Sequence, residues 1–223
     1  MTGIQLIIFD FDGVMIESVD VKTWAFAQLF KDEPAQVGAI VRYHKANGGI
    51  SRMAKIRHIY ADILRRPLPE ELFERLCGRY AALVVERVKA CPFVPGALEF
   101  LKAHAGQFDL YVVSGTPHEE IQAIVRDRGL TKFFKGVYGT PRSKGAWVKQ
   151  ILRTSGCGGP QALVVGDALA DHEAAVANGT HFVARVSPGD EDIFTGRDIT
   201  FKLPDLTGLA AVITSINTMA NKG

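Results

Sequence analysis

Short apolar runs that end in polar residues recur along the chain and predict strands. They are Leu6–Phe9, Leu110–Val113, Ala162–Val165 and Phe182–Val186. Continuous apolar runs of this length are typical of parallel strands that are buried on both faces of a sheet. The amphipathic stretches around them predict helices, which are Gly96–Ala105, His118–Arg128, Gly145–Thr154 and His172–Asn178. Strands alternating with helices predict a Rossmann-like, doubly wound parallel α/β sheet, in which ligands bind beyond the carboxyl ends of the strands.

The segment 16–88 interrupts this alternation, because it carries helical patterns and no convincing buried strand. One predicted helix spans Val19–Phe30, and another begins at Pro69, a residue type favoured in the first turn of a helix. We therefore expect residues 16–88 to form an inserted α-helical cap domain, and residues 1–15 and 89–223 to form a discontinuous α/β catalytic core. An insert at this point can close over the carboxyl ends of the strands.

The composition is that of a soluble globular protein and argues against two classes of partner. Hydrophobic residues make up 47% of the 223 residues, and 26 basic residues against 24 acidic ones leave a net charge of only +2. No block of like charge provides a surface for nucleic acid. No apolar run approaches the roughly 20 residues that span a bilayer, and the N-terminus lacks the pattern of a signal peptide. We expect neither a nucleic-acid partner nor a membrane partner.

The cysteines favour a reducing compartment. Cys77, Cys91 and Cys157 are odd in number and show no C-x-x-C spacing. This pattern argues against both a disulfide framework and a structural zinc site. We therefore expect a cytoplasmic protein.

The loop after the first predicted strand places two carboxylates close together. Asp10 and Asp12 are separated by one residue and followed by Gly13. One carboxylate of such a pair can attack phosphorus to form an acyl phosphate, while the other protonates the leaving oxygen and later activates water. Taken alone, the same residues also suit a strand that happens to end in an acidic turn.

Two later loops offer groups that bind phosphate or offset its charge. Ser114 ends the second predicted strand, and its hydroxyl, with the backbone N–H groups of Gly115 and Thr116, could hold phosphate oxygens. Lys144 lies at the start of a predicted helix and could neutralise both an attacking aspartate and a transferring phosphoryl group. Each residue alone is more often structural, since serines commonly end strands and lysines are usually solvated.

A second acidic pair follows the third predicted strand. Asp167 and Asp171 are four residues apart and can face the same way as a helix begins. Carboxylate oxygens suit Mg²⁺, which prefers a few oxygen ligands and keeps several waters. The alternative is an acidic helix start that stabilises the positive end of the helix dipole.

The order and spacing of these loops resemble the four motifs of the haloacid dehalogenase superfamily. The resemblance implies a nucleophile at Asp10, an acid/base at Asp12, a phosphate-binding hydroxyl at Ser114 and the conserved motif-three lysine at Lys144. It also implies an Mg²⁺ site made by the side chains of Asp10 and Asp167, the backbone carbonyl of Asp12, and Asp171 directly or through water. An acid/base at Asp12 favours phosphoryl transfer over carbon–halogen cleavage.

The position of the insert resembles the phosphoglycolate phosphatase and β-phosphoglucomutase branch of that superfamily. Gly48–Arg52 resembles the specificity loop of this branch, which implies substrate contacts at Ser51 and Arg52, with Arg52 holding an anionic group at the far end of the substrate. The alternative is a glycine turn followed by a helix N-cap at Ser51. His44 and Lys55 flank the loop on what is more often a solvated helix face.

These observations predict a magnesium-dependent phosphatase that hydrolyses a small phosphorylated metabolite, either a phosphoglycolate-like acid or a sugar phosphate. One alternative is a sugar phosphomutase of the β-phosphoglucomutase type. Lys22 stands where such mutases tend to carry histidine, which favours hydrolysis. The other alternative is a catalytically silent binding protein, against which the full set of motif residues argues.

Overall fold

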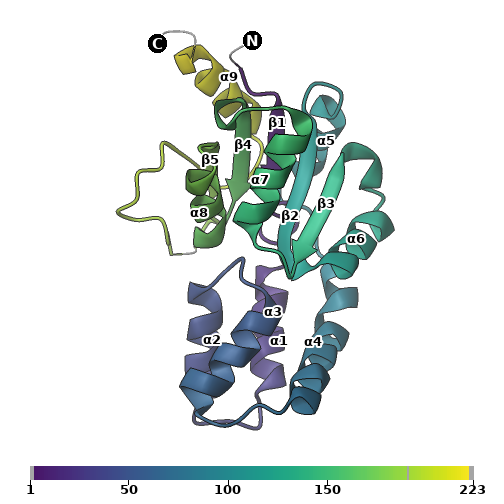
Figure 1. Ribbon diagram of the computed structural model, residues 1–223, viewed down its shortest axis with the longest axis vertical. Coiled ribbons are helices and arrows are strands. Elements are labelled where there is room, and N and C mark those ends of the chain that lie inside the picture. The colour runs from purple at the N-terminus through teal and green to yellow at the C-terminus, as the bar shows by residue number, and fades with distance from the viewer. Residues whose placement is uncertain (1–2, 190, 221–223) are drawn as a thin grey trace.

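The computed structural model describes residues 3–189 and 191–220, and in these residues six parallel strands form one sheet. In the order β3-β2-β1-β4-β5-β6, the strands are Gly136–Thr140, Asp109–Pro117, Leu6–Phe9, Ala162–Gly166, His181–Arg185 and Phe201–Leu203 (Figure 1). The predicted doubly wound sheet is confirmed. Its strand order reverses at β1, which pairs with β2 on one side and β4 on the other. In such sheets, ligands bind beside the loops at the point of reversal.

Helices cover both faces of the sheet, which explains the continuous apolar runs of its strands. Their bounds are α5 Ala97–His104, α6 His118–Asp127, α7 Lys144–Ser155, α8 Leu169–Ala177 and α9 Leu209–Ala220. Helices α5, α6 and α9 pack with Ile7 and Phe9 of β1, whereas α7 and α8 pack with Leu6 and Ile8. Because successive side chains of a strand point to opposite faces of the sheet, the side chains of β1 are buried on both faces.

Four further α-helices lie beyond the carboxyl ends of the strands, and we refer to them as the cap helices (Figure 1). They are α1 Val19–Leu29, α2 Val37–Ala46, α3 Arg52–His58 and α4 Glu70–Ala90, and a π-helix at Ile59–Leu64 extends α3. Phe26, Ile40, Ile56 and Tyr80 form part of their shared apolar interior. The division into two domains stays a prediction, and its boundary at 88/89 falls within the last turn of α4.

Several elements were not predicted from the sequence. Strand β3 carries two glycines and is only partly buried, and β6 has three residues at the other edge of the sheet. Neither shows a continuous apolar run, because an edge strand is covered less completely. Helix α9 is rich in valine, isoleucine and threonine, which weakens its helical signal. Within the described residues, no helix combines the length and apolar character needed to cross a membrane.

Candidate active site

Asp10 lies at the end of β1, in the centre of the sheet. Its backbone N–H donates to the carbonyl oxygen of Val165 in β4 (2.9 Å), so the sheet hydrogen bonding holds this residue in place. The carboxylate is 3% exposed. Its Oδ1 accepts a hydrogen bond from the N–H of Phe11 (2.7 Å), and its Oδ2 lies 2.8 Å from Lys144 Nζ. The predicted nucleophile is therefore oriented by one backbone donor and one cation.

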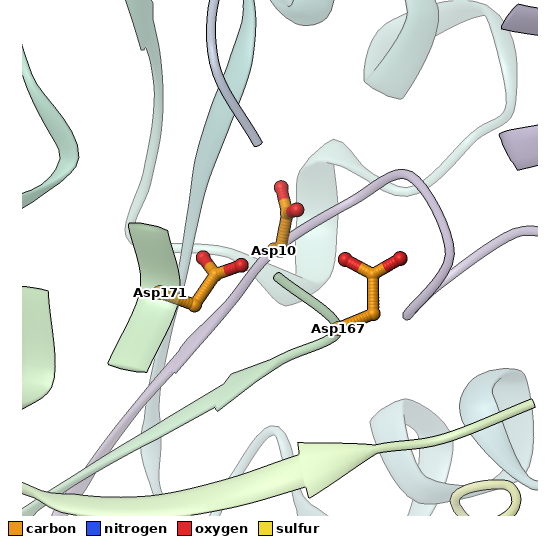
Figure 2. A group of neighbouring side chains, drawn as sticks. All are labelled: Asp10, Asp167 and Asp171. Atoms are coloured by element: carbon orange, nitrogen blue, oxygen red, sulfur yellow. The ribbon is translucent and has the colours of Figure 1, made fainter. Parts of the chain in front are cut away.

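Three carboxylates meet beside Lys144. Figure 2 shows Asp10, Asp167 and Asp171 facing a shared space, and one oxygen of each lies within 4.8 Å of the others. Lys144 Nζ also binds Asp171 Oδ1 (2.6 Å). Burial lowers the pKa of Lys144, but the charges of Asp10 and Asp171 outweigh this effect and leave it raised. Lys144 is therefore a permanent cation between two aspartates.

The acidic cluster fits a divalent cation. Burial, together with the negative charges of Asp10 and Asp171, raises the pKa of the Asp167 carboxyl well above its ordinary range. Burial also raises the pKa of Asp171, against the opposing charge of Lys144. One lysine does not neutralise three neighbouring carboxylates, two of them buried, and hard oxygen ligands are those that Mg²⁺ prefers. The predicted metal-binding side chains are thus brought together in a position suited to such an ion.

Asp12 points to a different environment from Asp10. Ser18 Oγ donates to Asp12 Oδ1 (2.7 Å), Thr116 Oγ1 donates to Oδ2 (3.1 Å), and Lys22 of α1 forms an ion pair with Oδ2. Burial raises the pKa of Asp12, but Lys22 and the hydroxyl donors outweigh it and hold the pKa below its ordinary value. The two aspartates of one loop are therefore separated into distinct electrostatic settings.

The predicted phosphate-binding loop lies next to Asp12. Ser114 Oγ accepts a hydrogen bond from the N–H of Thr116 (3.1 Å) and lies 3.4 Å from Asp12 Oδ2. Ser114 and Thr116 are buried at the end of β2. The sheet therefore places these hydroxyls and the Asp10–Asp12 loop side by side, as the sequence predicts for neighbouring parallel strands.

A buried arginine braces the loop that follows Asp12. Arg185, at the end of β5, donates to Glu17 Oε1 (2.6 Å) and Oε2 (3.1 Å), and to the carbonyl oxygen of Gly13 (3.2 Å). Gly13 has φ 80°, and any side chain here would collide with Asp167. Arg185 was not among the predicted site residues, although a charged residue at the end of an apolar strand was the available signal.

The predicted specificity loop contacts the core directly. Ser51 is the N-cap of α3, and its Oγ accepts a hydrogen bond from the N–H of Ala54 (3.2 Å). Arg52 forms an ion pair with Glu120 of α6, and its guanidinium lies 4.8 Å from the centre of the Tyr80 ring. Ser51 thus caps the helix, as the structural interpretation predicts, and Arg52 already has an acidic partner. The substrate contact expected at Ser51 stays a prediction.

A cavity of about 640 Å³ lies between the cap helices and the core loops. Core residues Asp10, Asp12 and Asp167 line it, as do Lys22, Phe26, His44, Arg52 and Lys55 from the cap helices. The sequence favoured a solvated helix face for His44 and Lys55, but both residues are buried. The cavity therefore joins the predicted catalytic carboxylates to a wall of cap residues that includes Lys22, Arg52 and Lys55.

Comparison with known proteins identifies the family of this chain. The sequence pattern of the haloacid dehalogenase-like hydrolases matches residues 4–179, and the chain belongs to that family. The predicted class of enzyme, a hydrolase of the phosphatase type, agrees with the relatives. A phosphoglycolate phosphatase of Aquifex aeolicus (strain VF5) is 28% identical over 184 residues, which cover 79% of this chain and 82% of that protein. One of Aliivibrio fischeri (strain ATCC 700601 / ES114) is 27% identical over 81% and 83% of the two chains.

Solved structures show the same fold. A predicted phosphoglycolate phosphatase from Haemophilus somnus 129PT has a TM-score of 0.76 at 21% identity, over 95% of this chain and 99% of that one. CbbY from Rhodobacter sphaeroides, solved in complex with phosphate, has a TM-score of 0.68 at 19% identity, over 92% and 96% of the two chains. The overall arrangement described above is thus shared with these solved structures.

Proposed function

We propose that this protein is a magnesium-dependent phosphatase that hydrolyses a small phosphorylated metabolite, a phosphoglycolate-like acid or a sugar phosphate, through an aspartyl-phosphate intermediate. One observation carries the proposal: Asp10 and Asp12, two residues apart, have different partners. Asp10 faces Lys144 and the acidic cluster, whereas Asp12 faces hydroxyl groups and Lys22. Pairs of carboxylates in contrasting environments support separate nucleophile and acid/base roles.

The proposed reaction has two displacements at phosphorus. An oxygen of Asp10 attacks phosphorus, the bond to the substrate oxygen breaks, and protonated Asp12 gives its proton to that leaving oxygen. Asp12, now a carboxylate, takes a proton from water, the water oxygen attacks phosphorus, and the acyl phosphate bond breaks to release phosphate and free Asp10. The contact with Lys22 favours the carboxylate form of Asp12, which is the form required in the second displacement.

The other site residues orient the reacting groups and offset their charge. Lys144 holds Asp10 in place and supplies positive charge beside the transferring group. We assign the hydroxyl of Ser114 and the backbone of Gly115 and Thr116 to the phosphoryl oxygens. Bound Mg²⁺, held by Asp10, Asp167, Asp171 and the Asp12 carbonyl, would offset the charge of the phosphoryl oxygens.

The substrate class rests on relatives and on cavity size. Two curated relatives named phosphoglycolate phosphatase support a small phosphorylated acid. A cavity of about 640 Å³ also has room for a sugar phosphate, since metabolite-sized ligands occupy cavities of roughly 300–1,000 Å³. Volume therefore does not restrict the substrate to a two-carbon acid.

The test is magnesium-dependent release of phosphate from a panel that contains phosphoglycolate, hexose phosphates and nucleotides. Asp10→Asn removes the nucleophile and should abolish release while preserving the fold, whereas Asp32→Asn, which changes an exposed aspartate away from the site, should be as active as the unaltered protein. Rates unchanged by Asp10→Asn would contradict the mechanism. Sugar phosphate interconversion that requires a bisphosphate would instead identify a phosphomutase, and magnesium binding with no turnover would identify a silent binding protein.

A further inference from the structure

Lys55 is a buried cation in the wall of the cavity. It belongs to α3, is 3% exposed and lines the cavity together with His44 of α2. Its Nζ is 3.0 Å from His44 Nδ1 and donates to the carbonyl oxygen of His44 (3.2 Å). The Phe26 ring packs against His44 at a tilt of 31°, with 4.4 Å between ring centres, and its centre lies 5.8 Å from Lys55 Nζ. The immediate neighbours of the ammonium group are therefore aromatic or uncharged.

The ammonium group lacks an acidic partner. Within residues 3–189 and 191–220, no Asp or Glu oxygen lies within 4.0 Å of Lys55 Nζ, although Asp20 and Glu191 also line the cavity. The other buried cations that line the cavity are paired, Arg52 with Glu120 and Arg185 with Glu17. A buried charge without a partner is unfavourable, because it has lost its hydration without gaining an opposite charge.

The electrostatic setting of Lys55 suits an incoming anion. Burial, together with the charge of Lys22 and against the opposing charge of Asp167, lowers the pKa of Lys55 to about 7. Burial also lowers the pKa of His44 far below its ordinary value, so the imidazole is neutral and its Nδ1 accepts the hydrogen bond. An anion next to Lys55 would restore the missing opposite charge and favour the protonated amine.

Hydrogen-bond geometry leaves one donor free. A lysine ammonium group has three N–H donors, and His44 accepts two of them, through Nδ1 and through its carbonyl oxygen. The third is available to a ligand in the cavity. Lys55 lines the same cavity as the carboxylates of Asp12 and Asp167, on its cap side.

We propose that Lys55, positioned by His44, binds a second anionic group of the substrate, at the end remote from the phosphoryl group that reacts. The ligand chemistry is an anionic oxygen group, which a carboxylate or a second phosphate can supply. The inference rests on the proposed phosphatase function and makes it more specific. Arg52, the residue that the sequence favoured for this role, already binds Glu120, whereas Lys55 has its charge and one donor available.

The experiment compares substrates that differ only in their far end. Phosphoglycolate and its homologues with one and two additional methylene groups are each paired with the phosphate ester in which the carboxylate is reduced to a hydroxymethyl group. A further series of substrates carries a second phosphate in place of the carboxylate. Lys55→Met should raise KM for at least one anionic series by about tenfold to a hundredfold, the usual effect of losing a hydrogen bond between charged groups, and leave its kcat unchanged.

Controls separate loss of the ligand contact from general damage. The neutral-ended substrates should change in KM by less than about twofold. Lys102→Met removes an exposed lysine of α5 outside the cavity and should leave every substrate unchanged. Lys55→Gln, which keeps a donor for His44, should show the same selective loss as Lys55→Met. Because both variants remove a buried unpaired charge, neither should lower the thermal unfolding midpoint.

A binding measurement tests Lys55 independently of turnover. Calorimetric titration of the Asp10→Asn protein with each pair of ligands should show that the anionic member binds more tightly, and that Lys55→Met removes this difference. Equal changes for anionic and neutral ligands, in KM or in Kd, would overturn the role of Lys55. Absence of phosphate release from every compound would refute the phosphatase function, and the titration would still decide whether Lys55 binds the anion.

Discussion

Replacing Asp167 with asparagine should stabilise the metal-free protein. One oxygen each of Asp10, Asp167 and Asp171 lies within 4.8 Å of the others. At 4.8 Å and an effective dielectric constant of about 20, one pair of carboxylates repels by about 3.5 kcal/mol. Asp167 faces two such neighbours, while Lys144 offsets part of the repulsion, so we expect a net gain of about 2–3 kcal/mol in the free energy of unfolding.

The gain should depend on pH with a defined sign. Because the folded-state pKa of Asp167 is raised, its ionisation costs no stability below its ordinary pKa of 3.8 and becomes unfavourable as the pH rises above that value. Asp167→Asn should therefore exceed the unaltered protein in stability by more at about pH 8 than at about pH 5. In Mg²⁺, the unaltered protein should instead be the more stable of the two, because the asparagine supplies a weaker ligand and one less negative charge.

The assay is unfolding by heat and by urea, in a chelator and in saturating Mg²⁺. In the chelator, the midpoint of Asp167→Asn should rise by roughly 4–10 °C for a chain of this size. In Mg²⁺, the unaltered protein should gain more stability than the variant does. Asp32→Asn removes an exposed charge and serves as the matched control. A metal-free Asp167→Asn protein no more stable than this control would refute the electrostatic reasoning, as would an undiminished response to Mg²⁺.

Two further predictions concern the contact between the cap helices and the core. A Cβ at Gly115 would collide with the carbonyl oxygen of Gly49, so Gly115→Ala should displace the specificity loop and lower kcat/KM by about tenfold. Gly106→Ala, where a Cβ meets nothing within 4 Å, is its control, and equal activity of the two variants would contradict this role. Lys22→Met removes the cation that holds the pKa of Asp12 low, so it should cost about 1–3 kcal/mol of stability at neutral pH. The stabilisation by Lys22 is present above the ordinary Asp12 pKa of 3.8 and is lost as the pH falls through the lower folded-state value. The difference in stability between the two proteins should therefore vanish in acid. Urea unfolding across pH measures this difference, which would stay constant if Asp12 were not involved.

Local sequence patterns were sufficient to predict the four inner strands of the sheet and the loops that follow them. The central strands are buried on both faces, so each appears in the sequence as a continuous apolar run that ends where its loop begins. Asp10 and Ser114 follow such runs directly, Asp167 follows one after Gly166, and Lys144 begins a helix. Parallel strands bring their carboxyl ends to one edge of the sheet, so this local order was enough to predict that these residues meet there. The edge strands β3 and β6 lack the pattern because they are covered less completely.

The partners of the charged residues in the cap helices were decided only by tertiary packing. Lys55 and His44 lie on different helices, and the packing of Phe26 against His44 helps make them the wall of a cavity instead of a solvated face. Arg52 meets Glu120 from a distant part of the chain. Local patterns report whether a segment is helical and which face is apolar, but the opposite charge that a side chain meets depends on how separate elements pack. Among the described residues, the same packing left no carboxylate within 4.0 Å of the buried Lys55 ammonium group, so only the folded structure distinguished it from Arg52.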